Sequence, residues 1–123
     1  MGIDWSDYGL YNDKQMPTDW LHVTSINPGM GYEWTTLHAF WSPSARRYFW
    51  ASGSGCSCNS WSDDLRTEAD FENGDRDALR RGIRRFVEGH SYSISGVDAL
   101  DALDEVARFK EDCPPGWPGE VKS

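Results

Sequence analysis

The chain has 123 residues, of which 38% are hydrophobic and 14% aromatic, and its formal net charge is -8 with a pI near 4.7. This length favours one domain with a core of its own, and the aromatic content excludes a chain that is disordered throughout. The excess of acids disfavours unspecific binding to nucleic acid or to an anionic membrane surface, because like charges repel.

The N-terminal sequence MGIDWSDYGL carries acids where a secretory leader carries basic residues, and no apolar run approaches the roughly 20 residues that cross a bilayer. The cysteine count is 3, an odd number that argues against a secreted disulfide framework. We therefore predict a cytoplasmic protein that does not contact a membrane and whose thiols are reduced or metal-bound.

Residues 1–31 are rich in Asp, Asn, Pro and Gly, which predicts a loop-rich N-terminal segment. A short strand is expected within it, over 21–25, followed by a turn at Asn27-Pro28-Gly29. Because no repeat or low-complexity linker is visible, we predict a single domain over 1–123.

The stretch YEWTTLHAFWSPSARRYFWASGSG predicts a β-hairpin over 32–52, with strands at 32–41 and 47–52 and a turn between them. Successive side chains of a strand point to opposite faces. One face of the first strand therefore carries Trp34, Thr36, His38 and Phe40, and the other carries Thr35, Leu37, Ala39 and Trp41. Both faces are partly apolar, so we expect a helix on one side and more chain or a partner on the other.

Two amphipathic helices are predicted after the hairpin, over 75–88 and 96–112. The inner stripe of the first helix is Leu79, Ile83, Phe86 and Val87. The second helix is expected to start after an N-cap at Ser95. Its expected inner stripe is Val97, Leu100, Leu103 and Ala107, with Val106 and Phe109 beside it.

A short strand is expected between the helices, over 90–94, and an extended tail over 114–123. These elements predict an α+β fold, with a small antiparallel β-sheet centred on the hairpin and both helices packed on it.

Two cysteines, Cys56 and Cys58, lie one residue apart in YFWASGSGCSCNSW. In an extended strand their Cα atoms would lie about 6.6 Å apart with parallel side chains, which disfavours a disulfide between them. We expect both thiols to pack as small apolar groups and predict no cofactor.

Two functional alternatives for this pair stay open. Two thiolates on one face could bind zinc, but the four-ligand pattern is incomplete because the remaining ligands form no second pair. These remaining candidates are Cys113, His22, His38 and His90. One of the thiols could instead be a nucleophile if a base such as His38 lies close to it.

The sequence ALRRGIRRFVEGH places Arg80, Arg81, Arg84 and Arg85 on one face of the first helix. Arginine forks suit phosphate oxygens, so this face could contact nucleic acid. We prefer an internal charge match, with acids of the second helix beside the arginines. Those acids are Asp98, Asp101, Asp104 and Glu105.

The tryptophan count of 7 exceeds the three or four that a core of about this size can hold. The surplus is expected at the surface, where Trp commonly anchors protein interfaces. Near the cysteines, Trp61 is followed by Asp63 and Asp64. These three residues are our predicted contact residues, although solvated surface is the ordinary explanation for such acids.

The run HAFWSPSARRYFWASGSGCSCNSW resembles a class of small uncharacterised proteins encoded by phages of actinobacteria. In these proteins an aromatic hairpin leads into a Gly-Cys-Ser-Cys element and then an acidic stretch. The matching residues are Tyr48, Trp50, Ala51, Ser54, Gly55, Cys56, Ser57, Cys58, Trp61 and Asp63. Some members carry Pro soon after the second cysteine, where this chain has Asn59-Ser60.

The resemblance covers the hairpin region alone and implies no established chemistry. It implies a phage accessory protein that works in the host cytoplasm on a host protein. We therefore expect a non-enzymatic protein that binds and modulates a host protein through an aromatic and acidic surface. The alternatives are a metal- or thiol-dependent enzyme that uses Cys56 and Cys58, or nucleic-acid binding through the arginine face.

Overall fold

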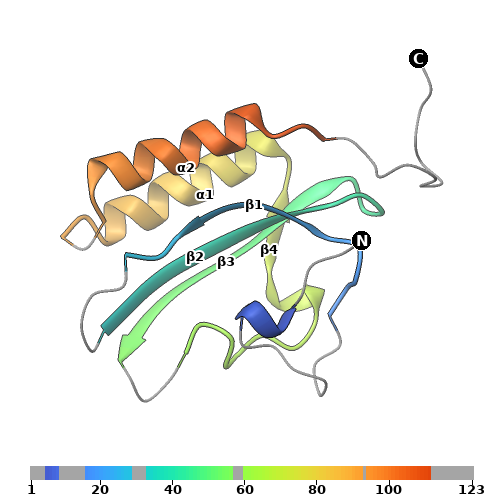
Figure 1. Ribbon diagram of the computed structural model, residues 1–123, viewed down its shortest axis with the longest axis horizontal. Coiled ribbons are helices and arrows are strands. Elements are labelled where there is room, and N and C mark those ends of the chain that lie inside the picture. The colour runs from blue at the N-terminus through green and yellow to red at the C-terminus, as the bar shows by residue number, and fades with distance from the viewer. Residues whose placement is uncertain (1–4, 9–15, 29–32, 57–59, 93, 112–123) are drawn as a thin grey trace.

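The computed structural model describes residues 5–8, 16–28, 33–56, 60–92 and 94–111. One antiparallel sheet contains β1 (Leu21–Ile26), β2 (Glu33–Ser42), β3 (Arg47–Cys56) and β4 (Glu72–Gly74) in that spatial order. Both helices, α1 (Arg76–Gly89) and α2 (Gly96–Arg108), cover one face of the sheet (Figure 1). The predicted α+β fold is thus confirmed.

The hairpin of β2 and β3 is the centre of the sheet and confirms the predicted one. Its strands pair over their full length, from Glu33 opposite Cys56 to Ser42 opposite Arg47. The turn closes with a hydrogen bond from the Arg46 N–H to the Ser42 carbonyl at 2.7 Å, and Arg46 has a φ of 54°. Strand β3 continues four residues beyond the predicted end of the hairpin at 52.

The predicted alternation of side chains along β2 is also correct. Leu37, Ala39 and Trp41 belong to the core beneath the helices, whereas Phe40 belongs to a second apolar cluster on the opposite face. The chain therefore covers both faces of the sheet.

The helix α1 packs through its predicted stripe, since Leu79, Ile83 and Phe86 are buried and Val87 is partly buried. Its N-cap is Asp75, whose side chain accepts a hydrogen bond from the Ala78 N–H at 2.8 Å. A Cβ atom at Gly82 would lie 2.6 Å from Nε1 of Trp50. The absence of a side chain there lets α1 lie close over the Trp50 indole.

The face that helix α2 turns to the core agrees only in part with the predicted one. Its N-cap Ser95 is as expected, but Val97 and Leu100 are 67% and 68% exposed. Ala102 and Val106 are buried, Leu103 and Phe109 are half-buried against the core, and Ala107 is exposed. The expected positions of Leu103, Val106 and Phe109 are therefore correct. Those of Val97, Leu100 and Ala107 are wrong, because the small Ala102 occupies a buried position that the prediction had assigned to none of these residues.

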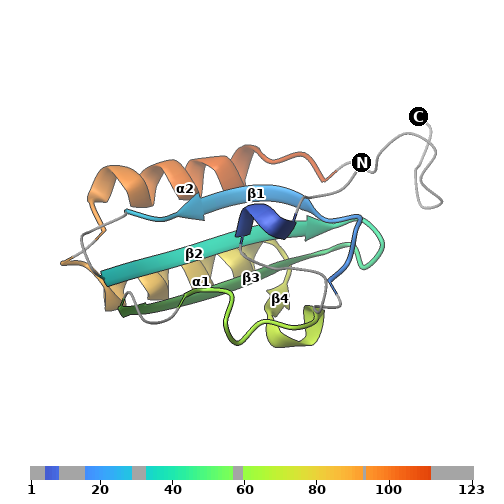
Figure 2. The same ribbon diagram turned by 60° about the horizontal axis from the view of Figure 1, so that its bottom comes forward.

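The opposite face of the sheet is covered by irregular chain. The 3-10 helix η1 (Trp5–Tyr8) and the segment after β3, including the 3-10 helix η2 (Glu68–Asp70), lie there (Figure 2). The buried residues of this cluster are Trp20, Phe40, Phe49, Leu65 and Phe71. Trp20 stacks on Phe49, with ring centroids 4.6 Å apart, and meets Phe71 edge to face at 5.2 Å. These contacts are typical of aromatic packing.

One arginine at the start of α1 holds the end of α2. The Arg76 guanidinium donates to the backbone carbonyls of Ala107 and Phe109, both at 2.9 Å, and pairs with Glu111 at 2.9 Å. Glu111 also accepts a hydrogen bond from the Tyr48 hydroxyl at 2.8 Å. Burial and the Glu111 carboxylate raise the pKa of Tyr48 far above its ordinary value.

Three further expectations about elements need correction. Residues 90–94 form a turn rather than a strand wherever they are described, and α2 ends at Arg108 rather than at 112. The short strand β4 was not predicted, since Glu72-Asn73-Gly74 has none of the residue types typical of strands. The predicted tail over 114–123 lies outside the described residues.

In the described part of the chain, neither helix is long and apolar enough to cross a membrane.

Candidate functional site

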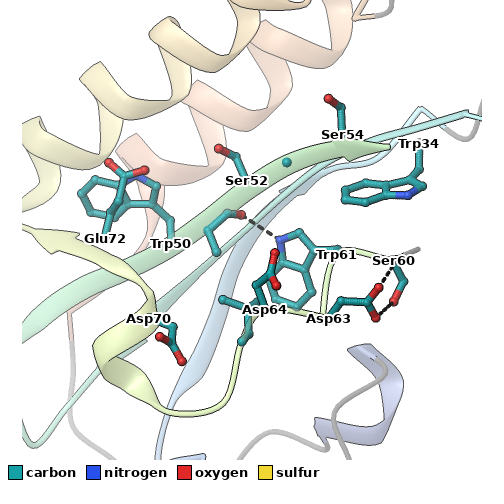
Figure 3. Close-up of a pocket in the computed structure, with 13 residues that line it drawn as sticks. Trp34, Trp50, Ser52, Ser54, Ser60, Trp61, Asp63, Asp64, Asp70 and Glu72 are labelled. Carbon is teal, nitrogen blue, oxygen red and sulfur yellow. Dashed lines mark hydrogen bonds between the residues drawn. The ribbon is translucent and has the colours of Figure 1, made fainter. Parts of the chain in front are cut away.

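A cavity of about 330 Å³ lies at the outer edge of β3 (Figure 3). We call it the trough, and we call residues 60–70, which border it opposite β3, the covering segment. Trp34, Trp50 and Trp61 line the trough, and the Trp50 ring is 3% exposed because it also packs beneath α1. Four carboxylates lie around it, those of Asp63, Asp64, Asp70 and Glu72. Residues Ala51 to Ser54 of β3, with Ser60 and Leu65 of the covering segment, complete the lining.

Trp61 joins the covering segment to the sheet. Its Nε1–H donates to the carbonyl of Ala51 at 3.0 Å. Its ring meets His38 edge to face at 4.6 Å and Phe71 at 6.1 Å. The predicted contact residue is therefore half-buried, with one side packed on the core and the other lining the trough.

Two of the four carboxylates also hold the covering segment in shape. Asp63 accepts hydrogen bonds from the Ser60 N–H at 3.0 Å and the Ser60 hydroxyl at 2.9 Å. Asp70 accepts from the N–H groups of Arg66 and Thr67, at 2.8 and 3.2 Å. These side-chain-to-backbone hydrogen bonds order the turns of the covering segment.

The other two carboxylates, those of Asp64 and Glu72, contribute less to holding the fold together. Asp64 is exposed. Glu72 lies 3.9 Å from Arg85 in an exposed ion pair, which contributes little to stability. Removal of these two charges would change the potential of the trough with the smallest effect on the fold.

Behind Trp61, two histidines share one serine. The pairing of β1 with β2 sets Ser25 opposite His38, and the Ser25 hydroxyl lies 2.6 Å from Nδ1 of His38. The same hydroxyl lies 2.7 Å from Nε2 of His22. Burial, and secondarily the neighbouring His22, lower the pKa of His38 to about 4. Burial also lowers the pKa of His22, although nearby Glu105 opposes the shift.

A serine within hydrogen-bond distance of an imidazole is the arrangement that activates a nucleophile in acyl-transfer enzymes. Here the low pKa makes His38 a weak base near neutral pH. Its ring also packs edge to face against Tyr8 at 4.8 Å and Trp61 at 4.6 Å. This chain of hydrogen bonds is therefore better suited to tying β1 to β2 than to turnover.

The cysteine pair lies at the end of β3. Cys56 is its last residue and is disulfide-bonded, whereas Cys58 and Cys113 lie outside the described residues. The expectation that Cys56 packs in the core as a reduced thiol is therefore wrong, because its sulfur is oxidised and the residue is exposed. Our argument against a disulfide between Cys56 and Cys58 concerns a partner residue that lies outside the described residues. A disulfide sulfur is not a thiolate, so in this state Cys56 provides no zinc ligand.

Metal binding has no further candidate in the part of the chain that the structure describes, since no three His, Cys, Asp or Glu side chains gather around one point there. Zinc binding at Cys56 and Cys58 remains a prediction for the reduced protein.

The four arginines lie on α1, and none of them lines the trough. Arg80 lies 3.7 Å from Asp77 on its own helix, and Arg85 lies 3.9 Å from Glu72 on β4. The acids of α2 were the partners that we expected for this face. The described ion pairs come instead from the helix itself and from β4, while Arg81 and Arg84 are exposed.

Comparison with known proteins places the chain in a family. Residues 9–112 match a family described as Domain of unknown function (DUF7574). The chain belongs to this family. No curated protein and no solved structure matches it. The match gives the DUF7574 family no activity and says nothing of phages or of the Gly-Cys-Ser-Cys element.

In this DUF7574 domain, three of the predicted contact residues line the trough, and their role in binding stays a prediction. Trp61, Asp63 and Asp64 were named in advance and lie together. Trp34, Trp50, Asp70 and Glu72 were not included, nor were His22 and Ser25 recognised as partners of His38. Trp34 had a usable signal, because the hairpin register sets it opposite Gly55 next to the cysteines.

Proposed function

We propose that this protein is a non-enzymatic binding protein whose trough receives part of another protein. The observation that carries the proposal is the trough itself, in which three Trp residues and four carboxylates surround a cavity beside an exposed strand. Trp residues supply large contact areas in protein interfaces, and carboxylates of one sign steer an oppositely charged partner.

We further propose that the protein is a phage accessory protein that acts in the host cytoplasm and modulates a host protein. The resemblance to actinobacteriophage proteins supports this origin and role. The net charge of -8 favours a partner with a basic surface over nucleic acid. The lowered pKa of His38 and the packing of its ring favour binding over catalysis as the role of this region.

Affinity capture from an actinobacterial lysate tests the proposal. The bait is compared with an Asp64→Asn/Glu72→Gln variant, which removes two charges from the trough. The control is Asp98→Asn/Asp101→Asn, which removes two charges from the surface between α2 and β1. We expect a host protein that the wild type and the control retain and that the trough variant loses in a salt-dependent way.

Equal capture by all three baits would show that the trough is not the contact surface. Catalytic turnover by the purified protein that disappears in Ser25→Ala would argue for an enzyme instead.

A further inference from the structure

The outer edge of β3 is left without a strand partner over half of its length. Strand β4 pairs with Tyr48, Phe49 and Trp50 alone, whereas β3 continues to Cys56. No other described strand lies next to this part of β3. An unpaired edge presents N–H and C=O groups that can form hydrogen bonds with a strand of another chain.

The Trp61 contact identifies which backbone groups of β3 face outward. The Ala51 carbonyl points to the edge, because the Trp61 indole reaches it from the covering segment. In an antiparallel sheet, the N–H and C=O groups of one residue point toward the strand on one side, and those of the next residue point toward the other side. Those of Gly53 and Gly55 therefore face the edge, and those of Ser52 and Ser54 face β2.

The two glycines leave this edge open to a second backbone. A Cβ atom at Gly53 would lie 3.3 Å from the Trp34 ring, so this glycine also makes room for the indole. A strand with glycine at alternate positions allows another chain to approach closely. Neither Pro nor Lys, which commonly protect edge strands, occurs between Ala51 and Cys56.

The charges around the edge decide what kind of strand fits it. Asp63, Asp64 and Asp70 lie on the covering segment, and Glu72 begins β4 in the row next to β3 (Figure 3). A second copy of this chain would bring the same carboxylates to the same place, and like charges would repel it. A segment with Lys or Arg side chains would instead be attracted.

We propose that an extended, basic peptide segment of the partner protein binds in the trough as an additional strand, antiparallel to β3 and in line with β4. Its backbone pairs with Gly53 and Gly55, while its basic side chains reach the carboxylates and its remaining side chains contact the indoles. The inference rests on the proposed function and specifies the partner segment that the trough receives.

Nuclear magnetic resonance titration of the full chain tests the inference. The probe is a short peptide of alternating lysine and valine. We expect the amide signals of Gly53 and Gly55 to shift and their hydrogen exchange to slow, with smaller changes at Ser52 and Ser54. A matched peptide with glutamate in place of lysine should not bind.

A second probe separates backbone pairing from charge attraction without any change in the protein. It is the same lysine peptide with N-methyl groups on those amides that would face β3. Loss of two hydrogen bonds should weaken its binding about tenfold. Asp64→Asn/Glu72→Gln should weaken binding of the unmodified peptide by a similar factor, and Asp98→Asn/Asp101→Asn should leave it within about twofold.

The outcomes are distinguishable. If both lysine peptides bind equally and the glycine signals do not respond, the strand addition is wrong while binding at an acidic surface stands. If neither lysine peptide binds but a captured host protein still depends on Asp64 and Glu72, the basic strand is wrong and the proposed function stands. If the protein itself forms dimers that protect Gly53 and Gly55, a second copy occupies the edge and the inference is overturned.

Discussion

The two faces of the sheet are buried in different ways. On one face, α1 and α2 supply mainly aliphatic side chains, such as Leu79 and Ile83, from regular helices. On the other, chain with little regular structure supplies aromatic rings, such as Trp20 and Phe71. Both kinds of packing exclude water, but only packing by helices leaves a periodic pattern of apolar residues in the sequence.

The difference also determines where a binding site can form. On the helical face, a cavity of about 300 Å³ between α2 and β1 is lined by acids of α2 and by the end of β1, without an aromatic ring. The aromatic face is covered by turns whose polar groups need partners, and it leaves the trough between the covering segment and β3. Binding residues commonly lie on such loops above a rigid scaffold.

The largest expected effect tests the helical face. Phe86→Ala should lower the free energy of unfolding by about 3–5 kcal/mol, because it removes a buried ring from the core between α1 and the sheet. Chemical denaturation with a Trp fluorescence readout measures the change. A loss below about 1 kcal/mol would contradict the packing of α1 described above.

The second effect tests the aromatic face through pH. The pKa of His38 is lowered to about 4, whereas an unfolded His has a pKa near 6.5, so the folded protein binds this proton more weakly. The folded protein is therefore most stable where His38 is neutral in both states, above pH ~6.5. As the pH falls toward ~4, proton binding by the unfolded chain lowers the free energy of unfolding by up to about 3 kcal/mol.

Thermal denaturation of wild type and His38→Gln across this range isolates the contribution, because other groups titrate in both proteins. The wild type should lose more stability on acidification than the variant. Parallel curves for the two proteins would mean that the imidazole of His38 is not desolvated.

The smallest expected effect tests the outer side of the helical face. Leu100→Gln should change the free energy of unfolding by less than about 0.5 kcal/mol, because this side chain is 68% exposed. The same substitution would cost several times more if α2 used the stripe that its sequence suggested. Denaturation beside wild type distinguishes the two orientations.

Local patterns predicted the fold wherever one element determined its own conformation. The hairpin, α1 and the cap at Ser95 follow from alternation, helical spacing and capping chemistry. The full orientation of α2 did not follow, because the fit of Ala102 against the sheet depends on tertiary distances. Strand β4 did not follow either, since its pairing with β3 gives strand structure to residues of low strand propensity.

The trough was only partly predictable for the same reason. Trp61, Asp63 and Asp64 are neighbours in sequence and could be named together. Trp34 and Glu72 reach the site from distant strands, and only the sheet register shows that they meet there. The shared hydrogen bonding of His22, Ser25 and His38 likewise depends on the pairing of β1 with β2.

The contacts of Arg76 determine which parts of the molecule unfold together in local fluctuations. This residue begins α1, yet it holds the backbone just before and just after the end of α2, and through Glu111 it reaches Tyr48 in the sheet. Neither helix end can fray without breaking contacts of the other, so the two should exchange their amide hydrogens as one cooperative unit. The covering segment is held to the sheet through Trp61 rather than through Arg76, so its amides should exchange through smaller, separate openings, which would let the trough admit a ligand while the helical core stays closed.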